Sequence, residues 1–188
     1  MTAVGVLLAG CASTQASTPR SAGPAPAMSM APGQSMAGMS MPSASAAAKP
    51  TATALMICSD DIKDKVKEVL KLSGQPQASS TFANQIYTCT YHLSIGPLVL
   101  AVQHSPSKTA AMSYFNHLKA TFGQTESLLG LGEKAYGAPS GVAVVLKDDE
   151  TLVVDARGVP AVFGHDQQKR TDLANEIASD VLGCWTGD

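Results

Sequence analysis

Residues 85–104 read QIYTCTYHLSIGPLVLAVQH, two runs of alternating apolar side chains on either side of the segment 94–97. Side chains alternate between the two faces of a β-strand, so a hairpin that pairs Leu93 with Leu98 collects the apolar ones on one face. That predicted face contains Tyr87, Cys89, Tyr91, Leu93, Leu98, Leu100, Val102 and His104. The stretch therefore predicts two antiparallel strands, about Gln85 to Leu93 and Leu98 to His104.

Helical patterns lie on both sides of this hairpin. Ser59 is a predicted N-cap before Asp60 and Asp61, and the apolar positions that follow recur at helical spacing up to Ser73-Gly74. Ser105-Pro106 is typical of a helix start, and Gly123 ends that second pattern. The pattern of a last helix runs from about Asp166 to Leu182.

The second half of the chain predicts further strands. We expect Val142 to Leu146 and Thr151 to Asp155 to form a hairpin that turns at Asp148-Asp149, with a short fifth strand at Val159 to Phe163. The order of elements is then α-β-β-α-β-β-(β)-α. Strands joined by hairpins indicate an α+β fold, an antiparallel sheet of about four to five strands with helices packed on one face.

The N-terminus resembles an export signal. The apolar run Ala3 to Ala9 is too short to span a bilayer, which needs about 20 apolar residues. Leu8-Ala9-Gly10-Cys11 resembles the lipobox of bacterial lipoproteins, which implies that residues 1–10 are a signal segment and that Cys11 carries the lipid. No Lys or Arg precedes Arg20, so we expect the true start to lie upstream of Met1. The alternative is a chance apolar N-terminus with an ordinary cysteine.

Composition then divides the rest of the chain. Residues 11–54 are rich in Ala, Ser, Pro and Met and show no hydrophobic period, so we expect a disordered linker. Residues 55–188 have the length of a single globular domain. From residue 51 onward there are eleven basic and fifteen acidic residues, a net charge of −4, which gives no electrostatic footprint for nucleic acid.

Three short stretches, ICSDDIKDKVKEVL, YTCTYHL and GLGEKAYG, resemble a family of actinobacterial envelope lipoproteins of unknown function. Related extracellular domains occur as sensors of receptor kinases. The resemblance covers most of residues 55–183 and implies the fold, a lipid-anchored location on the extracytoplasmic face of the cell membrane, and no catalytic residues.

Cysteine pairing has three solutions once Cys11 is set aside, because Cys58, Cys89 and Cys184 remain. The family resemblance implies a Cys58–Cys89 bridge, and the short reach from a helix start to the adjacent strand agrees with it. The rival is a bridge between Cys184 and Cys89.

Methionines are concentrated in the linker, in MSMAPGQSMAGMSM at residues 28–41. Thioether sulfur is a soft, neutral ligand that favours Cu(I). The candidate metal ligands are Met28, Met30, Met36, Met39 and Met41. A plain linker and a scavenger of oxidants, in which each sulfur becomes a sulfoxide, are the alternatives.

The sequence contains no GxSxG, HExxH or P-loop motif. Gly130 to Ala135 fits the GxGxxA dinucleotide pattern, but turn residues and a predicted hairpin follow it where that motif needs a helix. We therefore predict a tight turn there. The predicted function is a non-catalytic binding or interaction module, not an enzyme, whose partner is an envelope protein or a small ligand. The alternatives are a Cu(I)-handling protein and an enzyme of unrecognised type.

Overall fold

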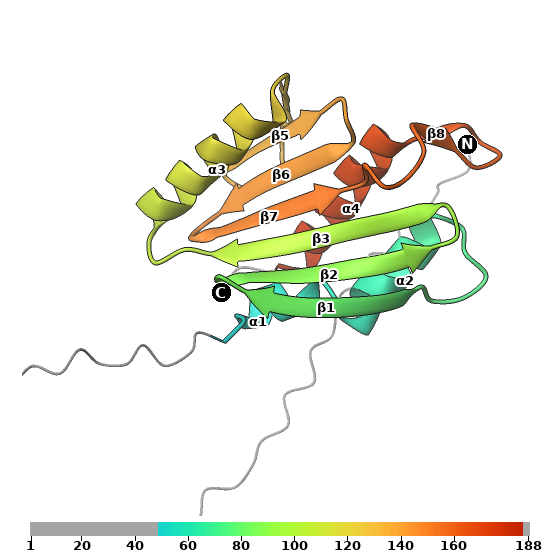
Figure 1. The fold of residues 1–188 in the computed structure, drawn as a ribbon, viewed down its shortest axis with the longest axis horizontal. Coiled ribbons are helices and arrows are strands. Elements are labelled where there is room, and N and C mark those ends of the chain that lie inside the picture. The colour runs from blue at the N-terminus through green and yellow to red at the C-terminus, as the bar shows by residue number, and fades with distance from the viewer. Residues whose placement is uncertain (1–48, 186–188) are drawn as a thin grey trace, which may run out of the picture. The chain divides into compact units, whose positions relative to one another are not determined.

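The computed structural model describes residues 49–185, which form a seven-stranded antiparallel sheet with helices packed against it (Figure 1). The helices are α1 (Ala52–Met56), α2 (Asp60–Val69), α3 (Lys108–Phe122) and α4 (Arg170–Cys184). The strands are β1 (Gln77–Ala83), β2 (Ile86–Leu93), β3 (Gly96–His104), β4 (Glu126–Ser127), β5 (Lys134–Ala138), β6 (Val142–Lys147) and β7 (Glu150–Asp155), in the spatial order β1-β2-β3-β7-β6-β5-β4. A separate ribbon pairs β8 (Val162–Phe163) with β9 (Gln168–Lys169). The predicted α+β class is confirmed.

The central hairpin has a different register from the predicted one. Leu93 pairs with Gly96 rather than with Leu98, so the loop holds only Ser94 and Ile95. The difference is two residues, and because side chains alternate with a period of two, the same side chains still share one face. Cys89 and Leu100, which face each other across the strands, are fully buried there.

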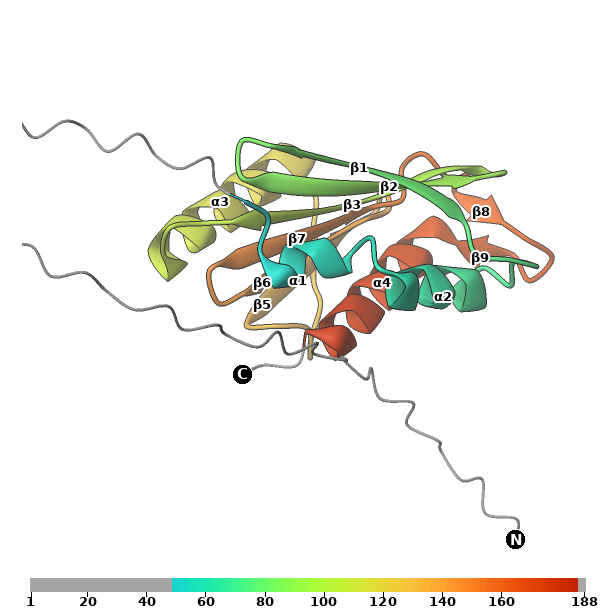
Figure 2. The same cartoon turned by 90° about the horizontal axis from the view of Figure 1, so that it is seen from below.

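Helices cover both faces of the sheet, which corrects the expectation of a single covered face. Helices α1, α2 and α4 lie together on one side (Figure 2) and share one apolar core with the strands. Helix α3 packs on the opposite side, where Phe115 meets Tyr136 with ring centroids 4.8 Å apart. Strand β6 explains the arrangement, because Ala143 and Val145 enter the first core while its alternate residues enter the second. A central strand that is apolar on both faces needs cover on both.

The strand count also exceeds the predicted four to five. Strand β1 was missed because its sequence, QASSTFA, is exposed and has no apolar alternation. Strand β5 contains Gly137, and β4 is only two residues long. The expected strand at Val159 to Phe163 is reduced to Val162 and Phe163, which pair outside the main sheet.

Several helix boundaries differ for local reasons. Ser107 rather than Ser105 caps α3, because the Ser105 N–H donates to the Asp149 carbonyl at 2.8 Å and holds the chain to the sheet. Helix α4 begins at Arg170 rather than Asp166, because the β8–β9 ribbon occupies the preceding residues. Helix α1 spans the expected boundary between linker and domain at residues 54 and 55. Ser59 caps α2 as predicted, accepting from the Ile62 N–H at 3.4 Å.

Candidate functional site

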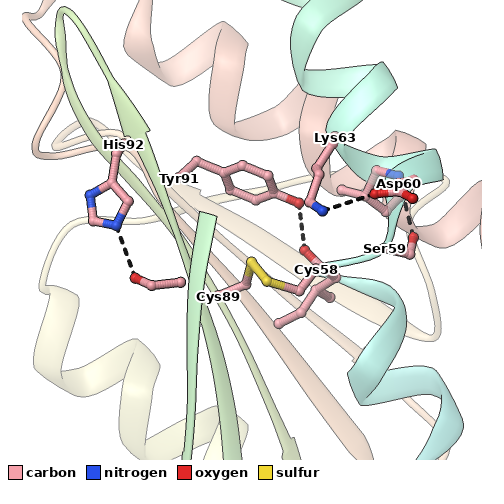
Figure 3. Close-up of a disulfide and its surroundings, with 10 residues drawn as sticks. Cys58, Ser59, Asp60, Lys63, Cys89, Tyr91 and His92 are labelled. Atoms are coloured by element: carbon pink, nitrogen blue, oxygen red, sulfur yellow. Dashed lines mark hydrogen bonds and ion pairs between the residues drawn. A yellow bond between two sulfur atoms is a disulfide. The ribbon is translucent and has the colours of Figure 1, made fainter. Parts of the chain in front are cut away.

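A disulfide joins Cys58, between α1 and α2, to Cys89 in β2 (Figure 3). The two Cα atoms are 5.5 Å apart, and the bridge closes a loop of 31 residues in sequence separation. The predicted pairing is therefore present. Cys184, the predicted rival partner, is buried at the end of α4 and takes no part in this bridge.

A Ser–His pair lies on the other face of the same strands. The Ser79 Oγ and His92 Nε2 atoms are 2.9 Å apart, and Figure 3 shows His92 pointing away from Tyr91 and the disulfide. A nucleophilic serine needs a base that is itself oriented by a third group. No acidic side chain of residues 49–185 pairs with His92. We interpret the contact as a cross-strand hydrogen bond.

The residue before helix α1, Thr51, is bonded to the sheet at the end where His104 of β3 pairs with Glu150 of β7. The Thr51 hydroxyl donates to the buried Glu150 carboxylate, and His104 Nδ1 lies 3.8 Å from both Asp149 Oδ2 and Glu150 Oε1. The hollow beside His104 has a volume of about 30 Å³. That space holds about one water molecule and is too small for a small-molecule ligand.

A larger hollow than the one beside His104 lies between the β4–β5 end of the sheet and the first turns of α4. We call it the α4 hollow. Its volume is about 260 Å³, close to the lower end of the range of ligand pockets. It is lined by Glu126, Leu128, Gly137, Ala138, Pro139, Thr171, Asp172 and Asn175.

Gly137 keeps one wall of the hollow open, because it has no side chain. A Cβ placed on Gly137 would lie 3.3 Å from Asn175 Oδ1 and 3.5 Å from Leu128 Cδ2. The polar residues that line the hollow supply two carboxylates, one amide and one hydroxyl, and its other lining residues are apolar. None of the lining residues is basic.

Carboxylates continue from the hollow along α4. Asp172, Glu176 and Asp180 recur every four residues on the rim of the helix that faces away from the core, and we call them the acidic row. Four residues of α-helix rise by about 6 Å, so the row spans about 12 Å. No Lys, Arg or His within residues 49–185 forms a salt bridge with Asp172 or Glu176.

These carboxylates repel one another. Partial burial raises the pKa of Glu176, and the charges of Asp180, Asp172 and Glu68 raise it further. Partial burial also raises the pKa of Asp180, and Lys65 opposes that shift. Like charges at this spacing destabilise a helix unless a cation lies among them. The part of the acidic row at Asp172 and Glu176 is therefore a negative surface that begins in the hollow, and Lys65 partly offsets the charge at Asp180.

The other residues predicted as sites lie elsewhere. Cys11 and the methionines proposed as Cu(I) ligands, Met28, Met30, Met36, Met39 and Met41, lie outside the described residues, and those proposals stay predictions. Within residues 49–185 no three His, Cys, Asp or Glu side chains are grouped to hold a metal ion. No helix in that range is long and apolar enough to cross a membrane.

Comparison with protein-family models, with curated proteins and with solved structures gives no match to this chain. The α4 hollow was also missed by sequence reasoning. The one signal that was present is the recurrence of acidic residues at positions 172, 176 and 180, within RTDLANEIASDV. The hollow itself depends on Gly137 and Asn175 meeting in space, which no spacing along the chain reveals.

Proposed function

We propose that the chain is a lipid-anchored binding module of the cell envelope whose α4 hollow and acidic row bind a small linear polyamine. The observation that carries the proposal is the α4 hollow, which is lined by Glu126 and Asp172 without a basic residue and opens onto the acidic row. The family resemblance and the lipobox at Cys11 support the location. The disulfide supports it too, because such bonds persist outside the cytoplasm.

Ligand size follows from the spacing of the charges. Carboxylates about 6 Å apart along a helix match ammonium groups that are separated by short methylene chains. The methylene chains would lie against Leu128, Ala138 and Pro139, and the amide oxygen of Asn175 accepts hydrogen bonds from an ammonium group. A single metal ion would neutralise one end of the row only.

Isothermal titration of the full chain with spermidine tests the proposal. Asp172→Asn and Glu176→Gln should each weaken binding about fivefold, as expected for the loss of one exposed charge pair worth about 1 kcal/mol. Asp61→Asn makes the same chemical change at the start of α2 and should leave the affinity unchanged. Raising the salt from 20 mM to 200 mM should weaken binding to the wild-type chain, because exposed charges are screened.

The Gly137→Ala variant tests the contribution of the hollow to binding separately from the contribution of the carboxylates. Its methyl group would lie against Asn175 and narrow the hollow without altering any carboxylate, and we expect weaker spermidine binding. An unfolding curve of the same variant shows whether the fold is retained. The proposal is contradicted if spermidine does not bind at millimolar concentration. It is also contradicted if all these variants bind spermidine with the same affinity. Calcium that binds more tightly than spermidine contradicts the assignment of the ligand.

A further inference from the structure

The two edges of the sheet are built differently. Strand β4, at one edge, has only two residues, one of which is Glu126. Strand β1, at the other edge, has seven residues with no charge, proline or glycine. Short strands and charged side chains are how proteins prevent edge-to-edge pairing. Only the β4 edge has that protection.

The hairpin turn decides which backbone groups of β1 are unpaired. Asn84 and Gln85 both have positive φ, 53° and 63°, as in the two-residue type I′ turn. Ala83 and Ile86, which flank this turn, are then a hydrogen-bonded pair, and the alternation of an antiparallel ladder fixes the rest. The N–H and C=O groups of Ala78, Ser80 and Phe82 point away from β2. Strand β1 is the last strand at this edge of the described sheet, so no described strand pairs with these groups.

The composition of β1 allows it to pair with the β1 strand of a second copy of the chain. We propose that two copies of the chain join through their β1 strands, antiparallel, about a two-fold axis at Ser80. This register places Phe82, whose side chain is among the exposed large apolar ones, opposite the small Ala78 of the second copy. Because β1 carries no charge, no like charges meet across the axis.

The pairing would satisfy the free edge of both sheets. Three pairs of residues would exchange about six backbone hydrogen bonds. The interface would be isologous, with the same patch used by both copies, as in most homodimers. This inference is independent of the proposed ligand, because the α4 hollow lies at the opposite edge of the sheet.

Sedimentation velocity on the full chain tests this pairing, in a Cys11→Ser background so that position 11 cannot link two chains. We expect a dimer that forms as the concentration rises. Ser80→Asp and Ser80→Lys should each raise the dissociation constant at least tenfold, because two identical charges would face each other at the axis. An equimolar mixture of the two variants should recover dimerisation to within about threefold of the unsubstituted β1 sequence.

Two further variants complete the test. Ser80→Pro removes an N–H that points outward and leaves the β1–β2 ladder intact, so it should abolish the dimer without loss of the fold. Ser73→Asp places the same charge in the exposed loop before β1 and should leave dimerisation unchanged. A chain that stays monomeric at millimolar concentration would overturn the proposal, and so would Ser80 variants that dimerise normally or a mixture that does not recover.

Discussion

The Tyr91 hydroxyl donates a hydrogen bond of 2.6 Å to the carbonyl of Ile57, which is 34 residues earlier in the chain. Both residues are fully buried. The bond ties the turn after α1 to strand β2, beside the disulfide at the adjacent Cys58 (Figure 3). Burial raises the pKa of Tyr91 well above its usual value, with a smaller contribution from Tyr87, so the hydroxyl remains a donor at alkaline pH.

Tyr91→Phe should lower the free energy of unfolding by about 1–3 kcal/mol, because the Ile57 carbonyl is left buried without its partner. Tyr114→Phe is the matched control, since Tyr114 is half-buried and its hydroxyl makes no hydrogen bond within the described residues. Urea unfolding of both variants is the measurement. Equal losses in the two would mean that the Tyr91–Ile57 bond contributes no more than an ordinary tyrosine hydroxyl.

The disulfide should contribute about 3–4 kcal/mol to stability, because it restricts a loop of about 30 residues in the unfolded chain. The Cys58→Ala, Cys89→Ala double variant should therefore unfold at a lower urea concentration than the wild type. Its loss should not add to that of Tyr91→Phe, because neighbouring sites couple. Mass spectrometry after alkylation without reduction should show both thiols blocked in the exported protein. Free thiols at Cys58 and Cys89 would contradict the presence of the disulfide.

The sequence predicted what depends on local periodicity. The buried face of the β2–β3 hairpin was predicted correctly even though the predicted register differed by two residues. Side chains alternate with a period of two, so a shift of two residues leaves each side chain on the same face. The cap at Ser59 was also correct, because an N-cap depends only on its neighbours in the chain.

Features that depend on contacts between distant segments could not be predicted. The apolar stripe of α3 was visible in the sequence, but the face on which it packs is decided by β6, which is apolar on both faces. Strand β1 has no pattern of its own and is a strand because β2 pairs with it. The α4 hollow exists where Gly137 lies against Asn175, two residues from separate elements.

Gly96→Ala should be among the more destabilising substitutions in the domain. Gly96 has a φ of +122°, and a Cβ there would lie 2.0 Å from the carbonyl oxygen of Gly158. Left-handed strain and a backbone clash together should cost at least about 2 kcal/mol. Gly74→Ala, where a Cβ meets nothing within 4 Å, is the control and should change stability little. Thermal unfolding of the two variants decides the matter, and similar melting temperatures would contradict the close approach of the two glycines.

Cys11 is predicted to be the lipid attachment site. In a host that processes lipoproteins, the full-length precursor should incorporate a fatty-acid analogue and fractionate with membranes. Cys11→Ser should abolish the label and release or mislocalise the protein, because the anchor depends on acylation of this thiol. The substitution of Cys184, which is buried in α4, should leave labelling unchanged and serves as the control. If the native precursor carries no label at Cys11, the protein is not anchored through this residue, and that part of the proposed function is wrong.

Asp180→Asn should stabilise the domain at neutral pH and have less effect in acid. Partial burial raises the pKa of Asp180 above its ordinary value of 3.8, Lys65 opposes the shift, and Glu68 adds to it. A carboxyl group whose pKa is higher in the folded state favours folding when it is protonated. Its contribution is therefore complete below 3.8 and is lost as the pH rises through the folded pKa. An asparagine remains neutral and avoids that loss.

Urea unfolding at pH 7 and at pH 3 is the measurement. The variant should be more stable than the wild type at pH 7, and the difference in stability should be smaller at pH 3. A loss at pH 7 would show that the Lys65 interaction outweighs the burial of the Asp180 carboxylate. A gain of equal size at both pH values would show that the effect of the substitution does not depend on the ionisation of Asp180.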